Sequence, residues 1–283
     1  NWNWLSKYHH KFRNTDFFFV YCGWYYSEQF AKEAEAIFTD LSLDKSRFYF
    51  MFNSAHEMSN FAPFGFEGDI INHNAWLDEN LIVSLSSQVE KSFDAIYVAR
   101  LSPFKRHYLA NKVPNLALVA GLNHGNPLED NLPKHTYRNP EPLTADEVCI
   151  KINEARCGLI LSEVEGACFS SSEYLLSGVP VVSTKSFGGR DVWYNEYNSI
   201  VCEPDPDAIA EAVQHFVKNP RDPFKIRGDH IVQSQMYRYK FISQLGRIFS
   251  TCGVCHNPET YFKDNYIHKM RTSYAPDFDE IFK

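Results

Sequence analysis

The residues whose types and spacing could do chemistry lie in the second half of the chain. Arg100 ends an apolar run, and Lys105 follows it after four residues. Further on, Glu165 and Glu173 bracket a turn that leads from another apolar run into a helical pattern. An arginine fork and a lysine ammonium can neutralise a diphosphate, whereas carboxylates accept hydrogen bonds from neutral hydroxyls. Together these residues indicate a ligand that carries both phosphate and hydroxyl groups.

A parallel sheet is the element that must position these four side chains. From about residue 94, apolar runs alternate with helical patterns, which predicts a βαβ series. The carboxyl ends of parallel strands meet at one edge, where helix N-termini point N–H groups at anions. We expect a helix that begins near Ser170 and carries Glu173 in its first turn. The expected strands are 95–99, 116–120, 159–161, 181–183 and 200–202.

Several helix ends are marked by local sequence. Thr144 and Glu147 have the spacing of a capping box, and Asp205 precedes a proline as an N-cap does. Gly178 stands where a left-handed residue would end the helix that starts near Ser170. An alternative without ligand binding remains for the two glutamates. In it, Glu165 is a solvated loop residue, and Glu173 is favoured by the helix dipole.

The first part of the chain predicts a smaller α/β unit. Residues 17–21 and 48–52 are expected strands, separated by an amphipathic helix, and a short apolar run follows at 70–71. We expect a reduced N-terminal lobe over residues 1–93 and a second lobe over 94–250. The tail, 251–283, is expected to cross back to the first lobe.

The order of these motifs resembles a known family. Arg100-x₄-Lys105 is followed by Glu165-Gly-x₆-Glu173, by Gly178-Val-Pro and by Gly188-Gly189. This order is similar to the C-terminal lobe of retaining GT-B glycosyltransferases with the E-x₇-E motif, the group 1 type, over residues 94–249. The resemblance implies an α/β fold that is GT-B-like, with two Rossmann-like lobes, a mostly parallel sheet and a reduced N-terminal lobe.

The resemblance also implies roles for individual residues. Arg100 and Lys105 would hold the donor diphosphate, Glu165 would contact the transferred sugar, and Glu173 would contact the ribose. On the acceptor side, the Cys22-Gly23 turn would replace the family's Gly-rich loop, and His56 or His73 its histidine, although such histidines are more often structural. The other implied donor-binding residues are Cys168, Phe169, Ser170, Asn139 and Gly189.

The implied function is that of a retaining hexosyltransferase, an enzyme of class EC 2.4. It would move a sugar from a nucleotide-diphosphate sugar to a hydroxyl of a glycan or a small molecule, without metal or cofactor. Two alternatives remain: a non-catalytic lobe that binds nucleotide-sugars, and a GT-B sugar-nucleotide epimerase.

Composition excludes some other classes. The net charge of −7 provides no field that would attract nucleic acid. The seven cysteines are odd in number and scattered, so we expect reduced thiols and a cytoplasmic protein. No run of apolar residues approaches the roughly 20 that a transmembrane helix needs. The Cys252-x-x-Cys255-His256 motif has the spacing of a haem or zinc site. A haem site would require an exported protein and a zinc site a fourth ligand, so we expect neither.

Overall fold

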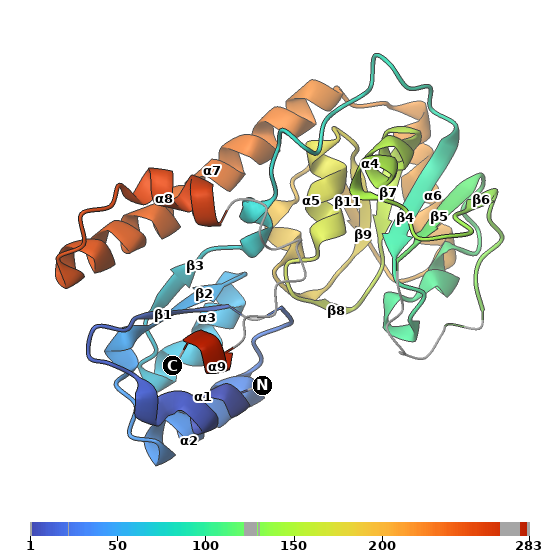
Figure 1. Cartoon of the computed structure of the whole chain (residues 1–283). Helices are drawn as coiled ribbons and strands as arrows, with labels where there is room; N and C mark the ends of the chain where they lie inside the picture. The colour runs from blue at the N-terminus through green and yellow to red at the C-terminus, as the bar shows by residue number, and fades with distance from the viewer. Residues whose placement is uncertain (1, 22, 122–128, 130, 267–277, 282–283) are drawn as a thin grey trace. The chain divides into compact units, whose positions relative to one another are not determined.

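A computed structural model describes residues 2–21, 23–121, 129, 131–266 and 278–281 (Figure 1). It divides the chain into two compact units. One comprises Asn1–Leu77 with Ser234–Lys283, and the other comprises Asp78–Gln233. The short 3₁₀ helices are η1 (His9–Lys11), η2 (Lys45–Arg47), η3 (Ala62–Phe64), η4 (His73–Trp76), η5 (Pro103–Lys105), η6 (His107–Ala110) and η7 (Arg190–Trp193).

The second unit is built on a six-stranded sheet whose neighbouring strands are all parallel. Its spatial order is β11-β9-β7-β4-β5-β6, which corresponds to 3-2-1-4-5-6 read from the β6 edge. The order therefore reverses between β4 and β7, and open sheets of this kind bind ligands at the carboxyl ends beside that point. The strands are β4 (Phe93–Ala99), β5 (Leu116–Ala120), β6 (Tyr137–Arg138), β7 (Ala155–Ile160), β9 (Val181–Thr184) and β11 (Ser199–Cys202).

Helices cover both faces of this sheet, with α4 (Ala145–Asn153) and α5 (Phe169–Leu176) on one face and α6 (Pro206–Lys218) on the other (Figure 1). Cys157 and Leu159 of β7 pack in one core cluster with residues of α6. Gly158 points the opposite way, where a Cβ would overlap the ring of Tyr174 in α5. The missing side chain therefore lets α5 lie close against β7.

The local signals for helix ends are confirmed. Thr144 and Glu147 form a reciprocal capping box at the start of α4, and Asp205 accepts hydrogen bonds from two backbone N–H groups of α6. Gly178 has φ +74° and follows Ser177, the C-cap of α5. These ends depend on residues close in sequence, which is why the sequence alone predicts them.

The first unit contains a parallel three-stranded sheet in the order β1-β2-β3. Its strands are β1 (Phe18–Tyr21), β2 (Phe48–Phe52) and β3 (Gly68–Ile70), and its early helices are α1 (Asn3–Tyr8), α2 (Glu28–Asp40) and α3 (Ala55–Phe61). Trp2, Tyr26, Phe38, Phe50 and Phe61 are among its buried core residues. Aromatic side chains thus provide most of the volume of a small core.

The C-terminal residues belong to the first unit, which also contains α8 (Pro258–Asn265) and α9 (Phe278–Ile281). Arg238, in the long helix α7 (Pro223–Cys252), donates hydrogen bonds to the carbonyl oxygens of Ala75 at 2.6 Å and Leu77 at 2.7 Å. The Tyr8 hydroxyl donates to Asp279 at 2.8 Å. No helix in the described ranges is long and apolar enough to cross a membrane.

The division falls at different residues from the expected boundaries at 93 and 250. Residues 78–92 join the second unit because their backbone is bound there: the Leu85 N–H donates to Asn153 Oδ1 at 2.7 Å, and Arg227 donates to the Ile82 carbonyl oxygen at 2.6 Å. The helix α7 runs through position 233, so its periodicity contains no sign of the boundary.

Candidate functional site

Arg100 and Lys105 lie against the same aromatic ring at the carboxyl end of β4. The Arg100 guanidinium carbon is 5.5 Å from the centroid of the Phe104 ring, and Lys105 Nζ is 5.0 Å from it. Both distances are within the range of cation–π contacts. The structure therefore brings together the two cations that the sequence singled out, and the intervening Phe104 provides their common support.

The backbone around Lys105 is fixed to neighbouring strands. The Tyr97 hydroxyl donates to the Lys105 carbonyl oxygen at 2.6 Å. The next residue, Arg106, has φ +54°, a conformation that costs a non-glycine residue about 1 kcal/mol or more. Its guanidinium donates to the Leu161 carbonyl oxygen at 2.6 Å and to Thr184 Oγ1 at 2.8 Å, which offsets that cost. Arg106 is a site residue that the sequence reasoning missed.

Glu129 anchors the other end of the same loop. Its carboxylate accepts hydrogen bonds from the backbone N–H groups of His107 at 3.2 Å and Tyr108 at 3.3 Å, and it lies 2.6 Å from His107 Nδ1. The imidazole is fully buried beside the Tyr97 ring, at a centroid distance of 4.5 Å. Lys105 therefore extends from a loop that is anchored on both sides.

Glu165 is buried and paired with Lys105. It ends the short strand β8 (Val164–Glu165), and its side chain is 7% exposed, against 13% for Lys105. Its Oε1 atom receives both the Lys105 ammonium and the Ser162 hydroxyl, the latter at 2.9 Å. The alternative that Glu165 is a solvated loop residue is therefore wrong.

The two glycines after β9 allow a second strand to approach Glu165. The strand β10 (Phe187–Gly188) pairs with β8, and Gly188 has φ +115°. A Cβ at Gly188 would overlap the Glu165 carbonyl oxygen, so this position requires glycine. The N–H of Gly189 donates to the Gly166 carbonyl oxygen at 3.0 Å, which places this predicted donor-binding residue beside Glu165.

The helix α5 begins at Phe169, and this changes the position of Glu173. Cys168 is its N-cap with φ +56°, and the first turn contains no acidic residue. The expectation that Glu173 lies in the first turn is wrong, because the helix starts one residue earlier than expected and Glu173 falls in the second turn. Glu173 is 8% exposed. The helix dipole, which acts within the first turn, thus does not explain this glutamate.

Cys168 and Ser170 also lie at the start of α5. Burial raises the pKa of the Cys168 thiol to about 11, so the thiol is protonated near neutral pH. The Ser170 hydroxyl donates to the Val98 carbonyl oxygen of β4 at 2.9 Å. Phe169, Ser170 and Glu173 therefore share a helix that is tied to the strand preceding Arg100.

Asn139 has a structural task at the end of β5. Its Oδ1 accepts the Ala120 N–H at 2.7 Å, and its Nδ2 donates to the carbonyl oxygens of Ala120 at 3.0 Å and Glu141 at 2.8 Å. Both amide N–H donors are thereby used within the protein. The Asn139 side chain therefore continues, at Ala120, the hydrogen bonding that β6 provides to β5.

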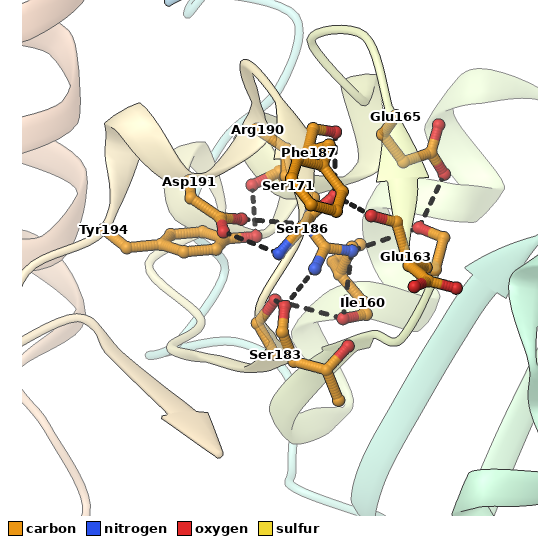
Figure 2. Close-up of polar contacts among 12 residues, drawn as sticks. Ile160, Glu163, Glu165, Ser171, Ser183, Ser186, Phe187, Arg190, Asp191 and Tyr194 are labelled. Atoms are coloured by element: carbon orange, nitrogen blue, oxygen red, sulfur yellow. Dashed lines mark hydrogen bonds and ion pairs between the residues drawn. The ribbon is translucent and has the colours of Figure 1, made fainter. Parts of the chain in front are cut away.

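A fully buried arginine beneath the site was not predicted. Arg190, the first residue of η7, is 0% exposed and donates to Asp191, Ser162, and the carbonyl oxygens of Ile160 and Thr184 (Figure 2). A buried guanidinium is tolerated only when its N–H groups are paired in this way. The available signal was an arginine immediately after Gly188-Gly189 and before an aspartate.

The predicted acceptor-side residues lie in the first unit. His73 is buried in η4, and desolvation lowers its pKa to about 4, so it is neutral at pH 7. His56 is exposed, and its Nε2 lies 2.8 Å from the Tyr25 hydroxyl. Gly23 has open space around it and no positive φ. Cys22 lies outside the described residues, so the expected Cys22-Gly23 turn is only half described.

The first unit also contains a cavity that the sequence did not indicate. Its volume is about 1370 Å³, and its lining includes Phe19, Tyr21, Trp76, Phe241 and Tyr261. Tyr21 also contacts the His73 ring, at a centroid distance of 5.2 Å. The cavity therefore offers aromatic surface next to one of the predicted acceptor-side residues.

No group of three or more metal-binding side chains occurs within the described ranges. Cys252 Sγ contacts the Thr15 carbonyl oxygen at 3.8 Å. The haem- or zinc-like spacing at Cys252 is therefore not accompanied by further ligands in this part of the chain.

Comparison with known proteins gives one family match. Residues 143–229 match the family described as Glycosyl transferases group 1, a segment of the second unit that covers less than half of the chain and includes Glu165, Glu173 and Arg190. No curated protein matches the sequence.

Several solved structures share the fold. HepE from Anabaena, crystallised with UDP and glucose, has a TM-score of 0.53 at 14% identity, over 81% of this chain and 71% of that chain. For α,α-trehalose 6-phosphate synthase from Burkholderia multivorans the TM-score is 0.55 at 12% identity, over 87% and 74%. For sucrose-phosphate synthase from Thermosynechococcus elongatus it is 0.54 at 15%, over 80% and 62%. The chain thus has a GT-B-like α/β fold, and residues 143–229 match the group 1 glycosyl transferases.

Proposed function

We propose that this protein transfers a sugar from a nucleotide-diphosphate sugar to a hydroxyl acceptor with retention of configuration, as a retaining hexosyltransferase. The observation that carries the proposal is the buried contact between Lys105 and Glu165, beside the point where strand order reverses. A phosphate-binding cation and a hydroxyl-binding carboxylate are thereby adjacent. This arrangement suits a ligand in which a sugar is bonded to a diphosphate.

Each motif residue then has a role in donor binding. Arg100 and Lys105 bind the diphosphate, supported by Phe104, and the N-terminus of α5 adds backbone N–H groups. Glu165 accepts a hydrogen bond from a sugar hydroxyl, and Glu173 accepts one from the ribose. Asn139 holds the end of β5 in place, and the base binds nearby.

The reaction proceeds by charge stabilisation. As the glycosidic bond breaks, negative charge grows on the leaving diphosphate, and the preorganised cations stabilise it by several kcal/mol. The acceptor hydroxyl attacks the sugar from the face that the diphosphate leaves, and a phosphate oxygen takes its proton. Configuration is retained because departure and attack occur on one face. No carboxylate bonds to the sugar, and the two cations make a metal unnecessary.

The comparisons support a nucleotide-sugar donor. HepE was crystallised with UDP and glucose, and also with UDP-glucose. Two further structures of similar fold are a trehalose 6-phosphate synthase and a sucrose-phosphate synthase. The family matched by residues 143–229 is one of glycosyl transferases.

A thermal-shift panel tests donor binding. UDP, GDP, ADP and their sugars are added separately, and the nucleotide that binds raises the melting temperature because it stabilises only the folded state. No response to any compound would contradict the proposal. Release of the nucleoside diphosphate on addition of an acceptor then tests transfer.

The same two assays separate the rival functions. A non-catalytic lobe would bind the donor and release no nucleoside diphosphate with any acceptor. An epimerase would convert one sugar nucleotide into another without an acceptor. Either result would replace the transferase assignment.

A further inference from the structure

A chain of buried hydrogen bonds connects Arg190 with the carboxylate of Glu165. Arg190 Nη1 donates to Ser162 Oγ at 3.0 Å, and that hydroxyl donates its own proton to Glu165 Oε1 at 2.9 Å. Arg190 and Ser162 are both 0% exposed. Figure 2 shows Arg190 to one side of the segment that ends at Glu165. The position of this carboxylate is therefore defined from within the core.

The guanidinium itself has little freedom. Nε donates to Asp191 Oδ1 at 2.8 Å, Nη1 also contacts the Ile160 carbonyl oxygen at 3.3 Å, and Nη2 donates to the Thr184 carbonyl oxygen. These partners lie on or directly after β7 and β9 and in η7. A planar fork with several fixed acceptors keeps one orientation, which a flexible ammonium would not.

The hydroxyl of Ser162 has a defined direction as a result. The arginine has no acceptor, so Ser162 must accept from Arg190, and its single proton is then available for Glu165. Glu165 Oε1 accepts this hydrogen bond from Ser162 and a second one from the Lys105 ammonium. Among the described residues, no hydrogen bond or ion pair reaches Glu165 Oε2. One oxygen is therefore occupied by the protein, and the other remains for a ligand.

We infer that Arg190 and Ser162 are positioning residues, which hold Glu165 so that Oε2 accepts the hydroxyl of the donor sugar. This inference rests on the proposed function, because it assigns a task to residues behind the proposed sugar contact. Neither residue touches the sugar. They act through Glu165, so their loss should affect the sugar and spare the nucleotide.

The test uses Ser162→Ala with a matched control, Ser183→Ala. Ser183 is also buried, and its hydroxyl donates to the Ile160 carbonyl oxygen at 3.1 Å, but the hydroxyl makes no contact with Glu165 (Figure 2). Both substitutions remove one buried hydroxyl near the same strand ends. The panel of UDP, GDP, ADP and their sugars first identifies the nucleoside diphosphate and the nucleotide-sugar that the wild-type protein binds. Calorimetry then measures the dissociation constants of these two ligands for each full-length variant.

For Ser162→Ala we expect affinity for the nucleotide-sugar to fall about tenfold, the size of one lost hydrogen bond to a charged group. Affinity for the nucleoside diphosphate should stay within about twofold. Ser183→Ala should leave both dissociation constants within about twofold of the wild-type values. We expect this even if Ser183→Ala lowers the melting temperature as much as Ser162→Ala does.

Equal losses for the two ligands in Ser162→Ala, or an unchanged nucleotide-sugar affinity, would overturn the positioning role while leaving the proposed function intact. Failure of wild type to bind any ligand of the panel would instead remove the proposed function, and this role with it. A second variant, Arg190→Lys, keeps the charge and loses the fork. It should show the same selective loss of sugar affinity, and retention of wild-type affinity by a folded Arg190→Lys would contradict the inference.

Discussion

The buried ion pair between Lys105 and Glu165 should contribute measurably to the free energy of unfolding, as a double-mutant cycle at the two positions can show. The pair is 13% and 7% exposed, so the solvent screens it poorly. At a protein-like dielectric constant of about 20, two charges about 4 Å apart attract by roughly 4 kcal/mol. A double-mutant cycle of Lys105→Met and Glu165→Gln isolates this attraction from the desolvation of each charge, so we expect a coupling energy of about 3 kcal/mol.

Urea unfolding followed by circular dichroism measures the four free energies of unfolding that the cycle needs. A control cycle of Lys112→Met and Asp207→Asn probes an ion pair in the same unit whose Nζ–Oδ2 distance is 2.6 Å but whose side chains are 55% and 65% exposed. That control should give less than about 1 kcal/mol. A coupling energy for Lys105 and Glu165 as small as that of the control would refute the conclusion that this ion pair is buried and poorly screened by solvent.

Three further substitutions test other parts of the structure. Gly188→Ala should lower donor affinity at least about tenfold and destabilise the protein by about 2 kcal/mol or more, because the new Cβ overlaps the Glu165 carbonyl oxygen; wild-type melting temperature and donor affinity would contradict this geometry. Glu173→Ala should weaken binding of the free nucleoside diphosphate by roughly tenfold in calorimetry through the lost ribose contact, and unchanged affinity would remove that role. His73 has its pKa lowered to about 4 in the fold, so its neutral form contributes stability above pH 6.5 that is lost as pH falls toward 4, by roughly 3 kcal/mol. His73→Gln should remove that loss from urea unfolding measured at pH 7.5 and pH 4.5, and an equal pH dependence in both proteins would show that His73 is not buried as described.

Local sequence signals predict the main buried strands of the second unit and several helix ends, but not the short strands β6, β8 and β10. The Thr144 capping box, the Asp205 cap and the left-handed Gly178 depend on contacts within a few residues, so the local sequence contains all the information they need. Short apolar runs predict the buried parallel strands, because a strand that is covered on both faces carries few polar residues. The local sequence therefore places the motif residues at strand ends and at a helix start.

The direct contacts within the site depend on the tertiary structure. The motifs place Lys105 and Glu165 at one edge of a sheet, but only the packing of the strands shows that the two side chains pair directly across 60 positions. The tertiary structure also shows that Arg190 is buried and donates to Ser162, that Arg106 donates to Thr184, and that Glu173 falls outside the first turn of α5. A hydrophobic period reports only whether a residue faces the core. Which partner it finds there depends on the sheet, whose pairings join residues far apart in the chain.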